Sequence, residues 1–484
     1  MPPSPSEWLP AGHLAFFILD VLGELDLSPI EEAIHAKDAR GVRPYDPRMM
    51  VALLLYAYCT GTFSSRRIAR ATYEDVAFRV ICGGVHPSFS SIGLFRRQHR
   101  KGLQALFTQV LVLCHRAGLV KLGHVAVDGT KMQGNASKHK AMSYERMQET
   151  EARLEGEVED LLKKAEGKDA DEDQRFGESE GDEDIPAELE RRSKRLEKIR
   201  SAKADLEAEA KQAAAAHKRE LAEGCRERAK TAATSKQQRL NETAAAKHEV
   251  EAAALTEGQA DDASPPFESA EGLPLHRPRH RPDGTPHPKA QANFTDPDSR
   301  ITNAAGHFIQ GYNCQAAVDD AAQIIVGQAT TNQSPDAGNF VPMLDVVKRS
   351  IGAYPEKVTG DAGYWTSNVF DECAARGVEP FIATERKKAW AENDAVTAGP
   401  APAELPAMER MRWSLHTPEG RDVYAKRKST VEPVFGQIKE ARGFRRFLMR
   451  GLEKVALEWS LLCTTHNLLK LFNAAGGQTA PGGV

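Results

Sequence analysis

Three acidic residues stand at positions from which a fold could gather their carboxylates. Asp128 ends the β-rich run VAVD and Asp361 ends the run KVTGD. Functional groups in open α/β sheets gather just beyond the carboxyl ends of strands, so these two carboxylates can converge although they lie far apart in the sequence. The third acid, Glu432, is on a predicted helix whose apolar side is formed by Val431, Val434, Phe435 and Ile438.

Three carboxylates on three rigid elements could hold two divalent cations. Magnesium prefers oxygen ligands, keeps several waters and binds through one or two carboxylates together with substrate phosphate. Two such ions about 3.5 to 4 Å apart activate the attacking oxygen and stabilise the leaving oxygen during in-line displacement at phosphorus. The pattern therefore indicates phosphoryl transfer that needs no protein nucleophile.

Each acid taken alone also fits a structural role. An aspartate beside glycine, as at Asp128, is often only a turn residue at the end of a strand. A glutamate on a charged helix, as at Glu432, usually faces solvent. The order of strand acid, strand acid and helix acid favours the functional interpretation over these alternatives.

Basic residues surround Glu432. Tyr424, Arg427 and Lys428 precede it by one or two helical turns, and Lys439 follows about two turns later. Arginine and lysine beside a carboxylate cluster suit contact with a phosphate backbone. The competing interpretation is i, i+4 pairing on a solvated face, such as Lys428 with Glu432.

A second basic run follows directly. It contains Arg442, Arg445, Arg446 and Arg450, with Phe444 and Phe447 between them. Arginines interleaved with aromatic residues suit a nucleic-acid surface, and we expect Arg445 and Arg446 to contact DNA. The same pattern also fits an amphipathic segment that packs its phenylalanines on the core.

Residues 1–118 predict a compact all-α domain. Their apolar residues have helical spacing, as in MMVALLLYAYCTG, with glycines just past the periodic stretches. Basic clusters that include Arg66 and Arg67, and Arg96 and Arg97, flank short predicted helices. This layout fits a helix-turn-helix-like reader of DNA. The alternative is a helical bundle whose basic exterior only keeps it soluble.

The remaining elements predict a mixed α/β domain with an insertion. After the strand VAVD and a long interruption, HFIQGYNCQAAVD and QIIVGQATT have the pattern of an antiparallel pair. Helix, strand, helix, strand and helix follow, and Asp336 is a candidate cap for the first of these helices. This succession indicates a mixed sheet covered by helices and interrupted between its first and second strands.

The interruption, residues 143–292, has a composition of its own. Met147, Leu154, Val158 and Leu161 fall at a and d spacing, and after an acidic break Leu189, Leu196, Ile199 and Leu206 resume it. We expect two long helices packed as an antiparallel, coiled-coil-like hairpin. The alternative is a solvated charged segment that is only partly helical. A linker rich in Pro, His and Arg ends the stretch, too dense in proline for helix or central strand.

Composition limits the protein class. The chain has 484 residues, a formal net charge of −4 and 27% charged residues, which are ordinary globular values. Seven scattered cysteines without a CxxC pair indicate buried thiols in a reducing compartment rather than a zinc site. No apolar run is long enough to span a bilayer and the first residues lack the order of a signal peptide, so we expect a cytoplasmic protein.

Five ordered motifs resemble those of one family. VAVDGTKMQGNAS, TDPDSR, GYNCQAAVD, TGDAGYW and YAKRKSTVEPVFGQIK are similar to DDE transposases of bacterial insertion sequences, and the N-terminal segment is similar to the helical domain that precedes the catalytic domain in this group. One departure is that the gap from Arg427 to Glu432 is a residue longer than the commonest Tyr-Arg-Glu-Lys signature. Arg427 and Lys428 therefore compete for one phosphate-contacting role.

The resemblance implies a fold and a domain organisation. The fold would be an RNase H-like, mixed five-stranded sheet flanked by helices, as in retroviral integrases. A helical DNA-binding domain would occupy residues 1–118, and residues 119–142 and 293–472 would form a discontinuous catalytic domain. The helical insertion with its linker would occupy residues 143–292, and residues 473–484 would form a flexible tail.

The resemblance also implies an activity. Asp128, Asp361 and Glu432 would bind two Mg²⁺ ions, for which Mn²⁺ can substitute. The enzyme would bind terminal inverted repeats in double-stranded DNA, cleave the ends and join the 3′-hydroxyls to target DNA. It would act as a homodimer or higher oligomer in the bacterial cytoplasm, associated with the nucleoid when bound to DNA. The alternatives are a nuclease of the same fold that does not join ends and a catalytically silent DNA-binding remnant.

Overall fold

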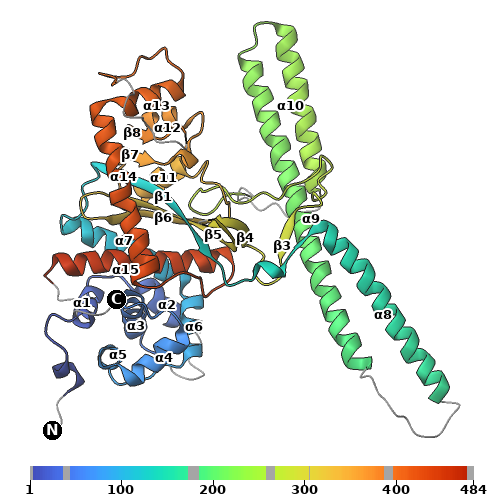
Figure 1. The fold of residues 1–484 in the computed structure, drawn as a ribbon, viewed down its shortest axis with the longest axis horizontal. Helices are drawn as coiled ribbons and strands as arrows, with labels where there is room; N and C mark the ends of the chain where they lie inside the picture. The colour runs from blue at the N-terminus through green and yellow to red at the C-terminus, as the bar shows by residue number, and fades with distance from the viewer. Residues whose placement is uncertain are drawn as a thin grey trace. The chain divides into compact units, whose positions relative to one another are not determined.

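The computed structural model describes residues 4–35, 44–172, 185–257, 267–304, 306–385 and 396–476. The chain divides into two compact units (Figure 1). Unit 1 contains residues 1–135, 269–274 and 302–484, and unit 2 contains residues 136–268 and 275–301. The second unit overlaps most of the predicted insertion, residues 143–292, but it begins at Ala136 and ends at Ile301, and residues 269–274 belong to unit 1.

The N-terminal part of unit 1 is helical, as predicted. Asp46 caps the central helix by accepting hydrogen bonds from the amides of Arg48 and Met49, and Pro47 occupies its first turn, where a missing amide proton costs nothing. Every residue of this helix from Met50 to Cys59 is buried. The helices are α1 (Leu14–Leu22), α2 (Ser28–His35), α3 (Pro47–Cys59), α4 (Ser65–Glu74), α5 (Val76–Ile81), α6 (Phe89–Gln98) and α7 (Arg100–Arg116).

Among the described residues, unit 1 contains a mixed sheet with the order β4-β5-β1-β7-β8, and β6 pairs with β5. Strand β5 is antiparallel to both β1 and β6, whereas β1, β7 and β8 are parallel. The sheet therefore has one strand, β4, more than the five expected. The strands are β1 (His124–Gln133), β4 (Arg300–Ala304), β5 (His307–Asp319), β6 (Ile324–Thr331), β7 (Lys357–Gly360) and β8 (Glu379–Ile382).

Five helices complete unit 1. They are α11 (Phe340–Ile351), α12 (Val369–Ala375), α13 (Ala407–His416), α14 (Pro418–Gly436) and α15 (Leu452–Ala474). Helix α14 contacts four strands, β1, β5, β7 and β8, whereas α15 contacts β6, α3 and α7. Residues 477–484, the end of the predicted tail, lie outside the described part of the chain.

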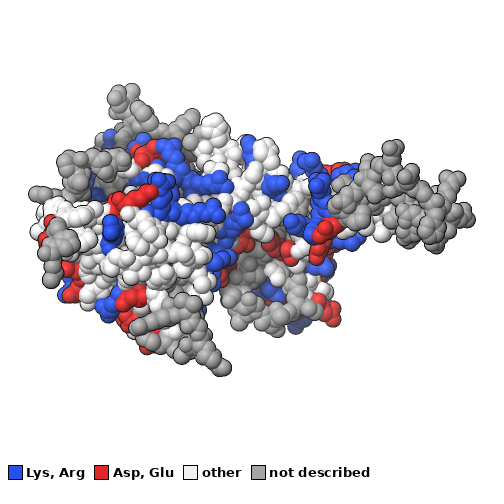
Figure 2. Space-filling model, turned by 90° about the horizontal axis from the view of Figure 1, so that it is seen from below, with Lys and Arg blue, Asp and Glu red and all other residues white. Residues whose placement is uncertain are grey.

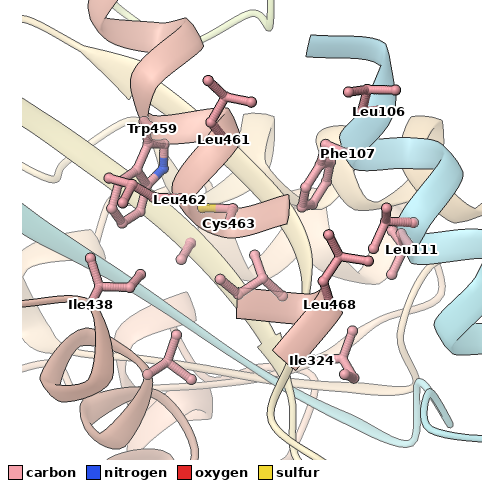
Figure 3. Close-up of a cluster of buried hydrophobic side chains, with 14 of the residues drawn as sticks. Leu106, Phe107, Leu111, Ile324, Ile438, Trp459, Leu461, Leu462, Cys463 and Leu468 are labelled. Carbon is pink, nitrogen blue, oxygen red and sulfur yellow. The ribbon is translucent and has the colours of Figure 1, made fainter. Parts of the chain in front are cut away.

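The N-terminal helices and the sheet share one hydrophobic core. Leu106 and Phe107 of α7 lie against Leu461 and Leu468 of α15, and Ile324 of β6 belongs to the same cluster (Figure 3). Because α15 is buried over most of its length, it packs on both groups of elements at once. This shared core explains why contacts do not separate residues 1–118 from the sheet.

The backbone groups on the outer edge of strand β6 are hydrogen-bonded at one point by a side chain. The Asn467 amide on α15 donates to the carbonyl of Ile325 at 2.8 Å, and its oxygen accepts from the amide of Ile325 at 2.9 Å. Asn467 thus replaces the two hydrogen bonds that a neighbouring strand would make.

Pro433 lies inside α14, near its end. A proline cannot donate to the carbonyl four residues earlier, which here belongs to Ser429. The side chain of Gln323 donates to that carbonyl instead, at 2.9 Å. A π-helical turn, Gln437–Ala441, follows α14, so helical phase changes just after Pro433.

Unit 2 is formed mainly by three helices, α8 (Tyr144–Glu172), α9 (Ile185–Lys230) and α10 (Ser235–Thr256). The predicted antiparallel hairpin is present as α8 against the first half of α9, and Met147, Leu154, Leu196, Ile199 and Leu206 form its buried core. Helix α10, which the spacing of apolar residues did not predict, packs against α9 as well. Residues 173–184 of the acidic break lie outside the described residues.

Ion pairs fix the antiparallel direction of α8 and α9. Arg192 lies 3.0 Å from Glu157, Lys203 donates to Glu151 at 2.7 Å, and Tyr144 donates to Glu207 at 2.7 Å. A short antiparallel pair, β2 (Ala141–Ser143) and β3 (Gln291–Asn293), joins the start and the end of the unit. In the described residues we find no helix with the length and apolarity that a bilayer crossing requires.

Candidate active site

The register of two parallel strands places Asp128 beside Asp361. Ala126 of β1 is paired with Thr359 of β7, and two further residues along each strand lead to the two aspartates. Adjacent strands lie about 4.8 Å apart, and residues two apart share a face. The sequence predicted this convergence, but it placed Asp128 at the end of its strand. In the structure β1 continues to Gln133 because the long strand β5 pairs with it that far.

Asp128 is a partly buried acid, with its side chain 19% exposed, and its charge is only partly compensated. Its Oδ1 accepts from the amide of Gly129 at 2.8 Å, and its Oδ2 lies 3.3 Å from Nη1 of Arg427. Burial raises the pKa of Asp128 to about 6 against the lowering effect of Arg427, and the negative charges of Asp361 and Asp336 raise it further. Burial and the neighbouring acids together thus outweigh the effect of Arg427 on this pKa.

Arg427 and Tyr424 of α14 face these acids. The Arg427 side chain is only 11% exposed, and its guanidinium lies 5.9 Å from the centre of the Tyr424 ring. Burial raises the pKa of Tyr424, and Asp361 and Asp128 add to this effect, while Arg427 lowers it. Of the two candidates for the phosphate-contacting role, Arg427 lies against Asp128, whereas Lys428 is exposed on α14.

Asp336 belongs to the same region, which the sequence did not predict. It does not cap α11 as expected: its carboxylate accepts from Lys131 at 2.9 Å, from Asn313 at 2.8 Å and from Gln315 at 2.9 Å. Gly129 leaves the space for this cluster, because a Cβ there would lie 2.6 Å from an Asp336 oxygen. Three donors satisfy Asp336, so it acts as an anchor whose charge still affects Asp128. The only sequence signal was an acid a few residues past a strand end.

Glu432 does not join the two aspartates in this structure. Its side chain is exposed, and it has no hydrogen bond or ion pair with another described residue. Arg427 points toward Asp128, and five residues later an α-helix has turned by roughly 140° from that direction. The extra residue in the gap between Arg427 and Glu432 thus explains why Glu432 faces away from the aspartates while Arg427 faces them.

The remaining basic residues of this region have other surroundings. Lys439, in the π-helical turn, donates to the carbonyl of Lys131 at 3.4 Å, and burial lowers its pKa. Arg445 pairs with Glu440, and Arg446 donates to Asn135 at 2.9 Å. Phe444 and Phe447 are buried, so this segment is the amphipathic alternative: Arg445, Arg446 and Arg450 are exposed, whereas Arg442 donates to Thr465 at 2.8 Å and to the carbonyl of Leu462 at 3.2 Å.

The N-terminal arginines divide into two kinds. Arg66, Arg67 and Arg97 are exposed on α4 and α6, and Lys and Arg gather on the face of unit 1 that carries the N-terminal helices (Figure 2). Arg96, in contrast, is 5% exposed. Its guanidinium donates to Tyr58 at 3.0 Å and to Ser65 at 2.6 Å, so in this structure it holds helices together and faces no ligand.

The donor set suits a divalent cation at Asp128 and Asp361. Two adjacent carboxylates offer oxygen ligands, and magnesium commonly completes its shell with water and substrate phosphate. Within the residues that the structure describes, no three Asp, Glu, His or Cys side chains are arranged to hold one ion. The fit therefore extends to the aspartate pair and not to Glu432.

Two family models match the chain. Residues 4–98 match the model described as "transposase domain (DUF772)", and residues 387–472 match the model described as "transposase DDE domain". The second match contains α14 with Arg427 and Glu432, and the first contains α1 to α6. No curated protein and no solved structure matches the chain.

Proposed function

We propose that this chain, which its two family matches make a DDE-type transposase of an insertion sequence, cuts DNA at the ends of its element and joins the freed 3′-hydroxyls to target DNA. The observation that carries the proposal is the placement of Asp128 and Asp361 at the same level of two parallel strands, with Arg427 against Asp128.

We further propose that the sheet is of the RNase H-like type. The order β6, β5, β1, β7 and β8, with β5 antiparallel to its two neighbours and the last three parallel, supports this assignment. In this interpretation β4 is an addition that follows the insertion.

The chemistry assigned to the site follows from its charges. Asp128 and Asp361 would hold magnesium, which when bound offsets the charge on the scissile phosphate and increases the acidity of the attacking hydroxyl. Arg427 and Lys439 would orient the phosphate backbone, since guanidinium and ammonium groups form charge-assisted hydrogen bonds with phosphate oxygens. Tyr424 supports Arg427 with its ring face.

Glu432 remains our proposal for the third acid. Pro433 and the π-helical turn that begins at Gln437 lie directly after it, and helices change register most readily at such features. A rotation of this part of α14 on binding DNA and metal would direct the carboxylate toward the aspartates.

The first experiment measures nicking of duplex DNA that carries the element's ends, with the full-length protein and magnesium. Asp128→Asn and Asp361→Asn should each slow nicking by a factor on the order of 10²–10³ or more, as loss of a charge-stabilising group does in other active sites. Binding to the same DNA should persist. Asp20→Asn, an exposed aspartate on α1, is the matched control and should nick normally.

The outcomes separate the competing functions. Normal nicking by Asp128→Asn would overturn the assignment of this acid. Wild-type protein that nicks DNA but does not join precleaved ends to a target would be a nuclease. Wild-type protein that binds ends but never nicks them would be a silent DNA-binding remnant. Glu432→Gln tests the third acid: nicking at the wild-type rate would remove it from the site.

A further inference from the structure

Unit 2 contains a cavity of about 680 Å³ lined mainly by basic side chains. Its walls come from the chain just before β2, the first turn of α8, one side of α9 and the segment after β3. The six lysines and arginines that line it are Lys140, Arg146, Arg191, Lys194, Arg195 and Lys198, and no acidic residue is among the lining residues.

The floor of the cavity is apolar and fixed. Ile199 is buried in the core between α8 and α9, and Met142 and Phe294 pack against that core. The basic side chains therefore extend from a rigid base. A binding surface on rigid elements holds its charged groups in place with less loss of conformational entropy.

Four of the six cations that line the cavity lack the ion pairs seen elsewhere on α9. Arg192, Arg200 and Lys203 on the same helix are paired with glutamates of α8. In contrast, the side chains of Lys140, Arg146, Arg195 and Lys198 form no hydrogen bond or ion pair with any described residue. Lys194 pairs with Glu190 of its own helix. Unpaired cations gathered around a concavity leave a positive potential that attracts anions.

The spacing of the α9 cations fits a polymer. Arg191, Lys194, Arg195 and Lys198 recur at three- and four-residue intervals on one side of the helix, so the row is about 10 Å long. Successive phosphates on one DNA strand advance by about 3.4 Å along the duplex axis, and the row therefore matches several phosphates. All four side chains are exposed, whereas a site for a small anion normally buries its ligand.

We infer that this basic cavity of the insertion binds the phosphate backbone of duplex DNA without reading its base sequence. The inference depends on the proposed function only for the choice of DNA as the ligand. Lysine and arginine on an open surface contact phosphates of any sequence, and such contacts fix the position of a protein on the duplex while carrying no base specificity. The cavity thus gives the insertion a role in holding DNA that is separate from the catalytic acids.

The test compares two triple variants of the full-length protein that lose the same charge. The cavity variant carries Arg146→Ala, Arg195→Ala and Lys198→Ala. The control carries Arg219→Ala, Lys236→Ala and Arg239→Ala, which are exposed helical residues of unit 2 outside the cavity lining. Binding of a fluorescent duplex of arbitrary sequence is measured by anisotropy from about 0.05 to 0.2 M salt.

The expected result is a smaller salt dependence in the cavity variant alone. Each phosphate contact contributes about 0.9 to the slope of log K against log salt, so three lost contacts reduce it by about 2.7. Over this salt range the wild-type protein should then lose roughly 40-fold more affinity than the cavity variant. The control should keep the wild-type slope. Circular dichroism checks that both variants retain their helices.

Several outcomes overturn the inference. Equal slopes in all three proteins would show that the cavity does not contact DNA, and an equal decrease in both variants would indicate a general effect of charge. Saturable binding of inorganic phosphate that only the cavity variant loses, with DNA binding unchanged, would make this a small-anion site. A changed oligomeric state of the cavity variant with unchanged DNA binding would make it a contact between copies.

The design also separates this inference from the proposed function. Asp20→Asn, the exposed control in unit 1, should keep the wild-type salt slope and should nick DNA normally. If the wild-type protein never nicks DNA and the cavity variant still loses its slope, the cavity stands as a DNA site and the catalytic proposal fails. If the wild-type protein nicks DNA normally and the cavity variant keeps the wild-type salt slope, the catalytic proposal stands and the inference about the cavity fails.

Discussion

Two groups of basic residues, which look alike in the sequence, have opposite roles in the fold. Arg96 of the N-terminal helices is buried against Glu458, which is fully buried, at 3.9 Å, and Glu458 also accepts the amides of Leu448 and Met449. Arg195 and Lys198 of the insertion are exposed, with no partner among the described residues. The difference lies in the neighbouring acceptors: a buried cation with an acid partner stabilises the fold, whereas exposed cations without one remain available for an anion.

The largest effect is expected where the charge is buried and paired. Arg96→Ala should lower the free energy of unfolding by about 3–5 kcal/mol, because it leaves Glu458 buried without its cation. Urea unfolding followed by the fluorescence of the protein's tryptophans, among them Trp459 in the same core, measures this. The neighbour Arg97 is exposed, and Arg97→Ala should change the value by no more than about 0.5 kcal/mol. Similar changes in the free energy of unfolding for the two variants would contradict the distinction between the buried Arg96 and the exposed Arg97.

An intermediate effect is expected at Asp128, whose side chain is partly buried and whose charge is only partly compensated. Its pKa is raised from 3.8 to about 6 in the folded protein, so the folded state binds the proton more tightly than the unfolded state does. Protonation therefore contributes stability that is complete below about pH 4 and is lost as the pH rises through about 6. The contribution amounts to about 3 kcal/mol.

Asp128→Asn removes this pH-dependent cost. In the presence of a chelator, the variant should gain stability relative to the wild-type protein as the pH rises from 4 to 7.5, by about 3 kcal/mol in total. Denaturation at each pH measures the difference, and Asp20→Asn provides the baseline for an exposed aspartate. A difference that does not change with pH would mean that burial does not perturb this acid.

The smallest effect on stability is expected for an exposed cation. Arg67, on α4, should behave like the cations of the insertion and not like Arg96. Arg67→Ala should change the free energy of unfolding by no more than about 0.5 kcal/mol and should reduce the salt slope of DNA binding by about 1 if Arg67 contacts a phosphate. An unchanged slope would show that Arg67 does not contact a phosphate and that the phosphate contacts lie on other surfaces.

The periodicity of apolar residues predicted much of the fold. The helical N-terminal region, the strands around Asp128 and Asp361 and the paired helices of the insertion all follow from local patterns. Helix α10 was missed because its buried positions, Ala245 and Ala252, are alanines that carry little periodic signal. The length of β1 was missed because it depends on pairing with β5, a contact distant in sequence.

The site was predicted in part for the same reason. The apolar runs VAVD and KVTGD located Asp128 and Asp361, since each run is a local pattern, although Asp128 lies within β1 and not at its end. The direction in which Glu432 points depends on its rotation around the axis of α14, and one extra residue after Arg427 changes that rotation. The anchor Asp336 and the buried Arg96 depend on tertiary neighbours that no spacing in the sequence shows.

The side chain of Asn467 has a consequence for how copies of the protein can meet. An exposed sheet edge is a template on which another molecule can add a strand, which leads to open-ended association. At Ile325 both backbone groups are already bound by Asn467, so strand addition there would first have to displace the amide. Both Asn467 and Ile325 are fully buried where α15 packs on β6, so replacing Asn467 with an apolar residue would leave two buried backbone groups without partners and loosen the helix that shields this edge.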